Sequence, residues 1–222
     1  MISVIIPVLN EELVIPGLLG MLDGLLGEKE VLFVDGGSTD ATLSLLQGRK
    51  LLHSEKGRAK QLNMGSLHAK GETLFFLHAD SILEKDALLR IEKSREEGAL
   101  YGCLRIHFDK DSLLMKNNAF FSHLRAKVGR TPFGDQGIFI DRDLFYQMGS
   151  FPEMALMEDY AFTRRLKRRG VPLTLLDSTI TTSARRYGKH PLKTMAKMFY
   201  LRHLFRRGVD PSILEKHYRD RR

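Results

Sequence analysis

The stretch Val31-Leu32-Phe33-Val34-Asp35-Gly36-Gly37-Ser38-Thr39-Asp40 decides the fold, because an uninterrupted apolar run ends there at an acid and two glycines. Short apolar runs with β-branched and aromatic side chains are typical of strands that are buried on both faces. The glycines permit a tight turn, and Ser38, Thr39 or Asp40 can cap a following helix. The stretch therefore predicts a buried strand, a turn and a helix, with Asp35 at the carboxyl end of the strand.

The same alternation extends on both sides of this stretch through the first hundred residues. Strands are predicted at 3–8, 31–34, 51–53 and 73–77, and helices at 16–26, up to 47, at 57–70 (ended by Gly71) and at 85–97. Further strands are predicted at 100–108, 137–140, 173–176 and 180–182, and further helices at 143–148, 157–169, 191–207 and 211–219. Residues 112–128 are predicted as a helix or a mobile segment. Apolar strands separated by amphipathic helices indicate an α/β chain with a mostly parallel sheet covered on both faces. Ligands of such sheets bind at the carboxyl ends of the strands.

Length and composition fit one ordinary globular domain. The 222 residues suffice for one α/β domain, and 43% hydrophobic with 28% charged residues predict a sizeable core. The single cysteine, Cys103, excludes an intramolecular disulfide and is expected in the core. No run reaches the roughly 18–20 apolar residues that span a bilayer, and no basic leader precedes the first apolar run. These features predict a cytoplasmic protein, free or peripheral on the inner membrane face.

The net charge of +8 is concentrated near the carboxyl end of the chain. Residues 185–222 hold twelve Lys and Arg against three Asp and Glu, whereas the other residues hold twenty-three against twenty-four. Because nucleic-acid-binding proteins usually carry basic charge on the main body, no nucleic-acid partner is expected. The change predicts a main domain over residues 1–185 and a basic helical extension over 186–222. That extension packs on the domain, packs on a second copy of the chain in a homodimer, or lies on an anionic membrane.

Two predicted strands end at acids that can contact a ligand. Asp35 can accept hydrogen bonds from a base or a ribose hydroxyl, or it can form a turn with its own backbone. His78 and Asp80 follow the strand predicted at 73–77, and residues i and i+2 of a strand share a face. A carboxylate beside an imidazole can hold a divalent cation on a diphosphate, whereas Asp80 can equally cap the next helix. The sequence leaves these alternatives open.

Two predicted helices begin with charged residues. Glu158 and Asp159 open a helix that is dense in Arg and Lys, where acids complement the helix dipole. Alternatively, one of them is a general base for an acceptor hydroxyl, and only one, because adjacent residues on a helix point in different directions. Gly57 and Arg58 begin another helix, whose free N–H groups attract phosphate. An ordinary surface turn is the alternative for Arg58.

Taken in order, these motifs resemble those of the inverting family 2 glycosyltransferases with the GT-A fold. The resemblance covers roughly residues 2–186, and its motifs are Ser3–Glu12, Val34–Asp40, His78-Ala79-Asp80 and Glu158-Asp159. More narrowly, segments 76–80, 134–139, 157–159, 183–186 and 207–211 resemble a subfamily of small stand-alone bacterial enzymes. The resemblance implies a GT-A (nucleotide-diphospho-sugar transferase) fold over residues 1–185, with a central sheet flanked by helices and a C-terminal helical tail.

The resemblance also implies a role for each matching residue. Asp35 would contact the base, Asp80 would hold Mg²⁺ or Mn²⁺ on the diphosphate, and Asp159 would be the general base, with Glu158 as the fallback. Asp135 and Gln136 would lie in the acceptor-side loop. The nucleotide-side residues are Pro7, Asn10, Glu11, Asp35, Gly36, Arg58, His78, Arg185 and Arg186.

Two departures from the family pattern limit this carry-over. His78 stands where the family has the first Asp of its Asp-x-Asp element, and imidazole favours softer divalent ions than magnesium. The chain has no tryptophan, so it lacks the Gln-x-x-Arg-Trp element of the processive members.

The function implied is transfer of a sugar from a nucleotide-diphosphate sugar, with UDP favoured, to a hydroxyl of a lipid, small molecule or glycan, with inversion. Three alternatives remain. A sugar nucleotidyltransferase would usually carry a glycine-rich loop after the first strand, which is absent here. A non-catalytic nucleotide- or anion-binding protein does not explain why acids follow the strands. A degenerate transferase is the third, because of His78.

Overall fold

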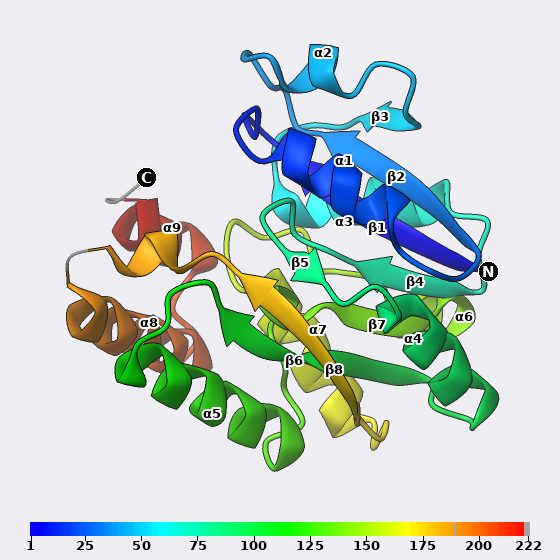
Figure 1. The fold of residues 1–222 in the computed structure, drawn as a ribbon. Coiled ribbons are helices and arrows are strands. Elements are labelled where there is room, and N and C mark those ends of the chain that lie inside the picture. Colours follow the sequence, from blue (N-terminus) through cyan, green and yellow to red (C-terminus); the bar gives the residue numbers. More distant parts are fainter. Residues whose placement is uncertain (189, 220–222) are drawn as a thin grey trace.

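The computed structural model describes residues 1–188 and 190–219, without the side chains of Arg186 and Arg219. Its described part forms one 8-stranded sheet in the order β3-β2-β1-β4-β7-β6-β8-β5 (Figure 1). The strands are β1 Ile2–Val8, β2 Lys29–Asp35, β3 Leu51–His53, β4 Thr73–Phe76, β5 Ile82–Leu83, β6 Tyr101–Phe108, β7 Ile138–Asp141 and β8 Thr174–Thr182.

Parallel pairing brings the carboxyl ends of the first strands to one edge of the sheet. β1 pairs in parallel with β2 and β4, and β2 with β3; Val8 at the end of β1 lies opposite Asp35 at the end of β2. β7 runs antiparallel to β4 and β6, whereas β8 runs parallel to β6 and antiparallel to β5. The predicted α/β class with a mixed, mostly parallel sheet is therefore confirmed.

Helices cover both faces of the sheet, as continuous apolar strands require. One core contains α1 (Ile15–Asp23), α4 (Ala87–Glu96) and α5 (Leu113–Lys127), which lie nearer the viewer in Figure 1. The opposite core contains α3 (Arg58–Leu67), α6 (Arg142–Gln147) and α7 (Glu158–Arg168). Neighbouring residues of β1 divide between the two cores, since Val4 and Ile6 join the first and Ile5 the second.

The remaining elements are short or belong to the carboxyl-terminal part. They are α2 Thr42–Leu45, the 3-10 helices η1 Gly134–Gln136 and η2 Ala184–Tyr187, α8 Pro191–Arg206 and α9 Pro211–Arg219. Leu201 of α8 and Leu214 of α9 share a third apolar cluster with Met157 and Tyr160 at the start of α7. The division of the chain into units 1–185 and 186–222 stays a prediction. Among the described residues, none of the helices has the length and apolar character needed to cross a membrane.

Several local predictions were wrong for identifiable reasons. Segments 173–176 and 180–182 form the single strand β8, because the whole stretch pairs with β6 around an irregularity at Cys103/Arg105. Strand β5 was missed because it has two residues, of which Ile82 is exposed. The helix predicted up to 47 is reduced to the four residues of α2.

The predicted role of Gly71 as a helix end was wrong, and the predicted burial of Cys103 was correct. Gly71 does not end a helix, since α3 ends at Leu67; a Cβ on Gly71 would lie 2.7 Å from the carbonyl oxygen of Met1. Its small size therefore allows close approach of the chain to β1. Cys103 is buried in the core as predicted, and burial raises the pKa of its thiol.

Candidate active site

The loops that follow β1 and β2 interlock at the carboxyl edge of the sheet. Asp35 is buried, and its carboxylate accepts hydrogen bonds from the backbone N–H groups of Gly37 (2.8 Å) and Ser38 (3.1 Å). Asn10 has a φ of 56° and accepts a 2.8 Å hydrogen bond from the N–H of Thr39, while its own N–H donates to the hydroxyl of Ser38 at 3.0 Å. The turn interpretation of Asp35 is therefore present in the structure, and a contact of Asp35 with a base stays a prediction.

Gln61 of α3 connects the ends of the same two strands, β1 and β2. The sequence analysis did not identify this residue. Its side-chain amide is buried and donates to the carbonyls of Val8 (2.8 Å) and Val34 (2.7 Å). A Cβ on Gly36 would lie 2.9 Å from the Gln61 amide carbon, so Gly36 leaves room for that amide. The available signal was a polar residue beside Leu62 on the inner face of a predicted helix.

Pro7 and Glu11 flank the first of these loops. Pro7 is half-buried and lies opposite Val34 in the β1–β2 ladder. The N–H of Glu11 donates to the Thr42 hydroxyl at 2.8 Å, and its carbonyl accepts from the N–H of Ile15 at the start of α1. Both residues thus lie beside Asn10, at the edge of the sheet where the nucleotide is predicted to bind.

The two candidate catalytic acids are the first residues of α7 and are both buried. Glu158 has 2% and Asp159 8% of its surface exposed. The preceding residue, Met157, has a left-handed backbone with a φ of 69°, which costs a non-glycine residue roughly 1–2 kcal/mol. Backbone strain of this kind often accompanies functional sites. No sequence pattern predicted the left-handed backbone of Met157.

Arg58 lies against these acids. Its Nε donates to Glu158 Oε1, and its Nη2 lies 3.8 Å from Asp159 Oδ2. The surface-turn alternative for Arg58 is therefore wrong: the side chain is 32% exposed and forms an ion pair with a residue 100 positions away. Burial opposes the charge on Arg58, but Glu158 and then Asp159 outweigh it and raise the pKa of the guanidinium.

The two acids are held in different ways. Burial raises the pKa of Glu158, and the charge of Asp159 acts in the same direction while that of Arg58 opposes it. Asp159 Oδ2 accepts a 2.7 Å hydrogen bond from the N–H of Gly134, and Asp159 Oδ1 accepts one from the N–H of Tyr160. Asp159 is thus a fixed carboxylate between η1 and Arg58.

His78 and this carboxylate both lie close to Gly134. A Cβ on Gly134 would lie 3.0 Å from His78 Nε2 and 3.2 Å from Asp159 Oδ2, so both groups crowd the same glycine. The prediction that His78 and Asp80 share a strand face was wrong. Strand β4 ends at Phe76, so neither residue lies in a strand. Because glycine has no side chain, Gly134 leaves room for both His78 and Asp159. The sequence analysis did not identify this role of Gly134.

Asp80 lies opposite Arg185. Their side chains form an ion pair of 3.8 Å between the segment after β4 and η2, and they are 30% and 60% exposed. Arg186 belongs to η2, but its side chain lies outside the described residues. Within the part of the chain that is described, three or more His, Cys, Asp or Glu side chains nowhere cluster as metal ligands.

The predicted acceptor-side loop is η1. Gln136 is fully buried; its Oε1 accepts a 2.9 Å hydrogen bond from Arg125, and its amide donates to the carbonyl of Leu104 at 3.5 Å. Asp135 is half-buried beside it. Gln136 therefore holds the loop that carries Gly134 from the interior of the domain.

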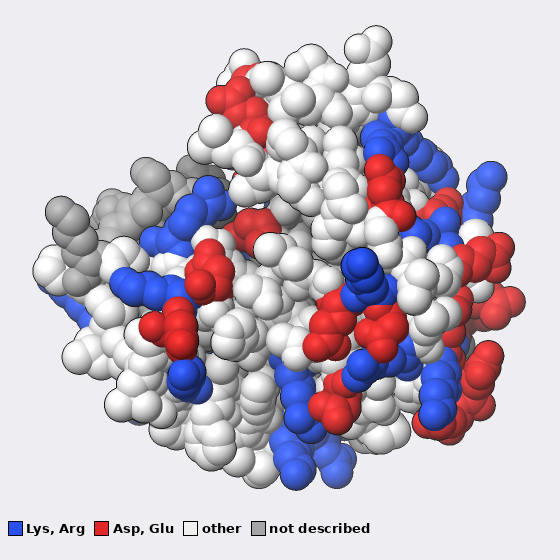
Figure 2. Space-filling view, in the orientation of Figure 1, with Lys and Arg blue, Asp and Glu red and all other residues white. Residues whose placement is uncertain are grey.

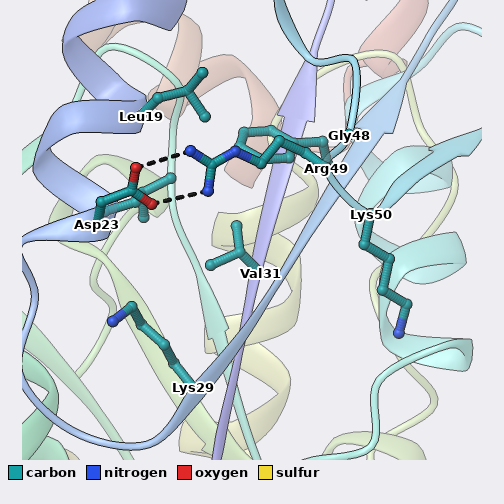
Figure 3. Close-up of a pocket in the computed structure, with 9 residues that line it drawn as sticks. Leu19, Asp23, Lys29, Val31, Gly48, Arg49 and Lys50 are labelled. Carbon is teal, nitrogen blue, oxygen red and sulfur yellow. Dashed lines mark hydrogen bonds and ion pairs between the residues drawn. The ribbon is translucent and has the colours of Figure 1, made fainter.

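On the face shown in Figure 2, Lys and Arg lie beside Asp and Glu where charged residues occur, and much of the rest is uncharged. A cavity of about 310 Å³ lies where β2 and β3 begin, and its lining includes the 2.8 Å ion pair of Asp23 and Arg49 (Figure 3). Lys29 is the first residue of β2 and Lys50 directly precedes β3. This cavity therefore lies at the opposite edge of the sheet from Asp35.

Comparison with known proteins places this sheet and its flanking helices in the class of GT-A transferases. Residues 3–151 match the family described as Glycosyl transferase family 2. The chain belongs to glycosyl transferase family 2. A PGL/p-HBAD biosynthesis glycosyltransferase of Mycobacterium bovis is 29% identical over 213 residues, which cover 85% of this chain and 78% of that protein.

Solved structures show the same fold. The mannosyltransferase PcManGT from Pyrobaculum calidifontis, in complex with GDP-Man and Mn²⁺, has a TM-score of 0.69 at 21% identity, covering 97% of this chain and 67% of that chain. S. aureus TarS 1–349 in complex with UDP-GlcNAc has a TM-score of 0.67 at 21% identity, covering 86% of this chain and 60% of that one. The chain thus spans less than two thirds of the TarS fragment. The predicted GT-A fold is confirmed, and the protein is a glycosyltransferase of the nucleotide-sugar-using type.

Proposed function

We propose that the chain transfers a sugar from a nucleotide-diphosphate sugar to an acceptor hydroxyl with inversion, and that Asp159 is the general base. The observation that carries this proposal is the convergence of Asp159, His78 and the N–H of Gly134 at one point, with Arg58 behind them. A fixed carboxylate is suited to accept a proton from a hydroxyl that attacks the anomeric carbon. Glu158 is less suited, because it is directed into the ion pair with Arg58.

The donor would bind along the carboxyl edge of β1, β2 and β4. There Pro7, Asn10, Glu11 and Gly36 form the rim, and Asp35 would face the base. Arg185 and Arg186 would meet the diphosphate as cations, which stabilises the charge of a departing nucleoside diphosphate. Arg58 would contribute to this site by pairing with Glu158 and Asp159.

A divalent cation fits this site only together with the donor. Asp80 supplies one partly exposed carboxylate and His78 one imidazole, so phosphate oxygens and waters would complete the coordination, as is usual for magnesium. Asp80 and His78 would hold Mg²⁺ or Mn²⁺, which would offset charge on the leaving diphosphate. The PcManGT complex with Mn²⁺ supports a metal in a protein of this fold.

The choice of nucleotide and acceptor rests on analogy. TarS binds UDP-GlcNAc and PcManGT binds GDP-Man, and the family resemblance favours UDP. The acceptor hydroxyl belongs to a lipid, a small molecule or a glycan, and η1 with Asp135 would line its approach.

A thermal-shift screen of UDP-, GDP-, dTDP- and CDP-sugars, each with and without manganese, tests the proposal. We expect one nucleotide to raise the melting temperature in a manganese-dependent way, and the Asp80→Ala protein to lose the manganese-dependent part. A matched variant, Asp23→Ala at the opposite edge of the sheet, should keep it. A chain that binds none of the four donors would contradict the proposal.

A further inference from the structure

A second cavity lies on the outer side of α7, between the end of α5 and α8. It has a volume of about 470 Å³ and is bounded by five cationic side chains and the ring of Tyr160; the lining residues belonging to the described part of the chain include no acid. The cations are Arg125, Arg164, Lys167, Arg168 and Arg206. We name this cavity the basic cleft.

The spacing of residues along α7 creates one wall of the basic cleft. Tyr160, Arg164, Lys167 and Arg168 recur at intervals of three and four residues, so they lie on one face of the helix. Arg165 points elsewhere, since it donates to the carbonyls of Gly149 and Ser150 after α6. Of the basic residues of α7, Arg165 therefore binds backbone carbonyls after α6, whereas Arg164, Lys167 and Arg168 face the cavity.

The cations of the basic cleft are brought close together. The guanidinium carbons of Arg164 and Arg206 each lie 5.7 Å from the centre of the Tyr160 ring, and Arg206 Nε donates to the Tyr160 hydroxyl at 2.6 Å. None of the carboxylates described lies within ion-pair distance of Arg164, Lys167, Arg168 or Arg206. Such charges repel one another unless an anion lies between them.

Arg125 of the basic cleft and Arg202, which is not in its lining, also contribute to the positive field. Arg125 stacks on Phe133 with its guanidinium carbon 3.9 Å from the ring centre, and its Nη2 is held by Gln136. Burial lowers the pKa of Arg202 on α8, and the charges of Arg125 and Arg206 lower it further. The gathered charge thus extends over α5, α7 and α8.

We propose that the basic cleft binds a phosphate group, at a site distinct from the donor's. Guanidinium and ammonium groups from three helices can donate charge-assisted hydrogen bonds to phosphate oxygens, and a dianion would relieve the repulsion between them. The site does not depend on the role proposed for Asp159. The basic cleft and the acid pair share helix α7, on which Tyr160 of the cleft follows Asp159 directly.

The phosphate belongs either to a soluble molecule or to a lipid headgroup. The helix that contributes Arg125 also exposes the apolar side chains of Phe121, Leu124 and Val128, which is the surface a bilayer would meet. The experiment below therefore includes both sources.

The first arm uses inorganic phosphate and the arginine Nε–Hε NMR signals of the ¹⁵N-labelled chain, assigned with Arg164→Gln and Arg206→Gln. We expect saturable shifts of these two signals. The triple variant Arg164→Gln/Lys167→Gln/Arg168→Gln should weaken phosphate binding by at least about tenfold, since hydrogen bonds between charged groups are strong. The control Lys85→Gln/Lys93→Gln/Arg169→Gln removes the same charge from outside the basic cleft and should bind as the wild type does.

The second arm measures co-sedimentation with vesicles of phosphatidylcholine containing phosphatidic acid, with and without competing phosphate. Sedimentation that the triple variant loses and the control keeps assigns the site to a lipid phosphate. Saturable phosphate binding without sedimentation assigns it to a soluble phosphate. Shifts that rise linearly with phosphate, or that are equal in the triple variant and the control, overturn the proposal.

Discussion

Two largely buried glutamates lie at opposite edges of the sheet, and their pKa values move in opposite directions. Glu30, near the start of β2, accepts hydrogen bonds from the Ser3 hydroxyl, the Lys70 N–H and the Lys50 ammonium group. Burial opposes its charge, but these donors outweigh burial and lower its pKa to about 2. For Glu158, at the carboxyl edge, burial raises the pKa despite Arg58.

The difference lies in what surrounds each carboxylate. Glu30 has four donors, the fourth being the N–H of Gly71 at 3.3 Å, and it joins β1, β2 and the segment before β4. Glu158 has one cation, which it shares with a second acid, Asp159, and it follows the left-handed Met157. Perturbed acids and strained backbone collect where a ligand is expected to complete the arrangement. The surroundings of Glu30 therefore stabilise the fold, whereas those of Glu158 agree with the binding and catalytic site that we propose at the carboxyl edge.

The largest expected effect comes from removing the charge of Asp159. Asp159→Asn should reduce sugar transfer by about 10²–10⁴-fold, because an amide cannot accept the acceptor proton. Donor binding, measured by thermal shift with the nucleotide sugar that the screen selects, should be unchanged. Glu30→Gln is the matched control at the other edge and should transfer at the wild-type rate per folded molecule. Wild-type transfer by Asp159→Asn would remove Asp159 from the mechanism.

The next effect is on stability and concerns Arg58. Arg58→Met leaves Glu158 and Asp159 buried without a cation, which should lower the free energy of unfolding by about 3–5 kcal/mol. The loss should shrink as pH falls, because protonated Glu158 needs no cation. Urea unfolding at pH 7 and pH 5 measures both quantities.

Two variants sharpen this test. Arg58→Met/Glu158→Gln should recover part of the lost stability, since it removes one buried charge together with its partner. Lys50→Met at the amino edge should cost about 1 kcal/mol or less, because Lys50 is 40% exposed and Glu30 keeps its other donors. Equal losses for Lys50→Met and Arg58→Met would contradict the contrast between the two edges.

Local elements and long-range contacts differ in how far the sequence predicts them. Strand 51–53 was predicted to the residue and the turn at Asp35 was one of the two interpretations offered, because both depend on local apolar runs and glycines. The Arg58–Glu158 pair joins residues 100 apart, and no local pattern encodes such a contact. Likewise, the acids of α7 could be named from the sequence, but the approach of His78 and Gly134 to Asp159 depends on tertiary packing.

A pH dependence tests the amino edge directly. The pKa of Glu30 is lower in the folded chain than the usual 4.5, so its contribution to stability is complete above about pH 4.5 and is lost as pH falls towards 2. A shift from 4.5 to about 2 corresponds to at most about 3–4 kcal/mol, and partial exposure of Glu30 reduces it. Glu30→Gln should therefore be less stable by about 2–3 kcal/mol at pH 7, with the difference disappearing towards pH 2. Parallel urea titrations over this range would reveal it, and a difference independent of pH would show that packing, not charge, is responsible.

The smallest expected effect is the most specific to the carboxyl edge. A methyl group at Gly134 would press on His78 Nε2 at 3.0 Å and Asp159 Oδ2 at 3.2 Å, so these groups must move apart by a few tenths of an ångström. Because transfer depends on their alignment, Gly134→Ala should slow it roughly tenfold. The melting temperature should change by only a few degrees, since Gly134 needs no left-handed backbone.

Gly20→Ala is the matched control, because Gly20 lies within α1 and a Cβ there meets no atom within 4 Å. Alanine at that position should raise stability slightly and leave transfer unchanged. If Gly134→Ala slowed transfer and also lost several kcal/mol, Gly134 would be a packing residue like Gly71. If it lost activity alone, as we expect, the close approach of His78 to Asp159 would be a requirement of the reaction rather than of the fold.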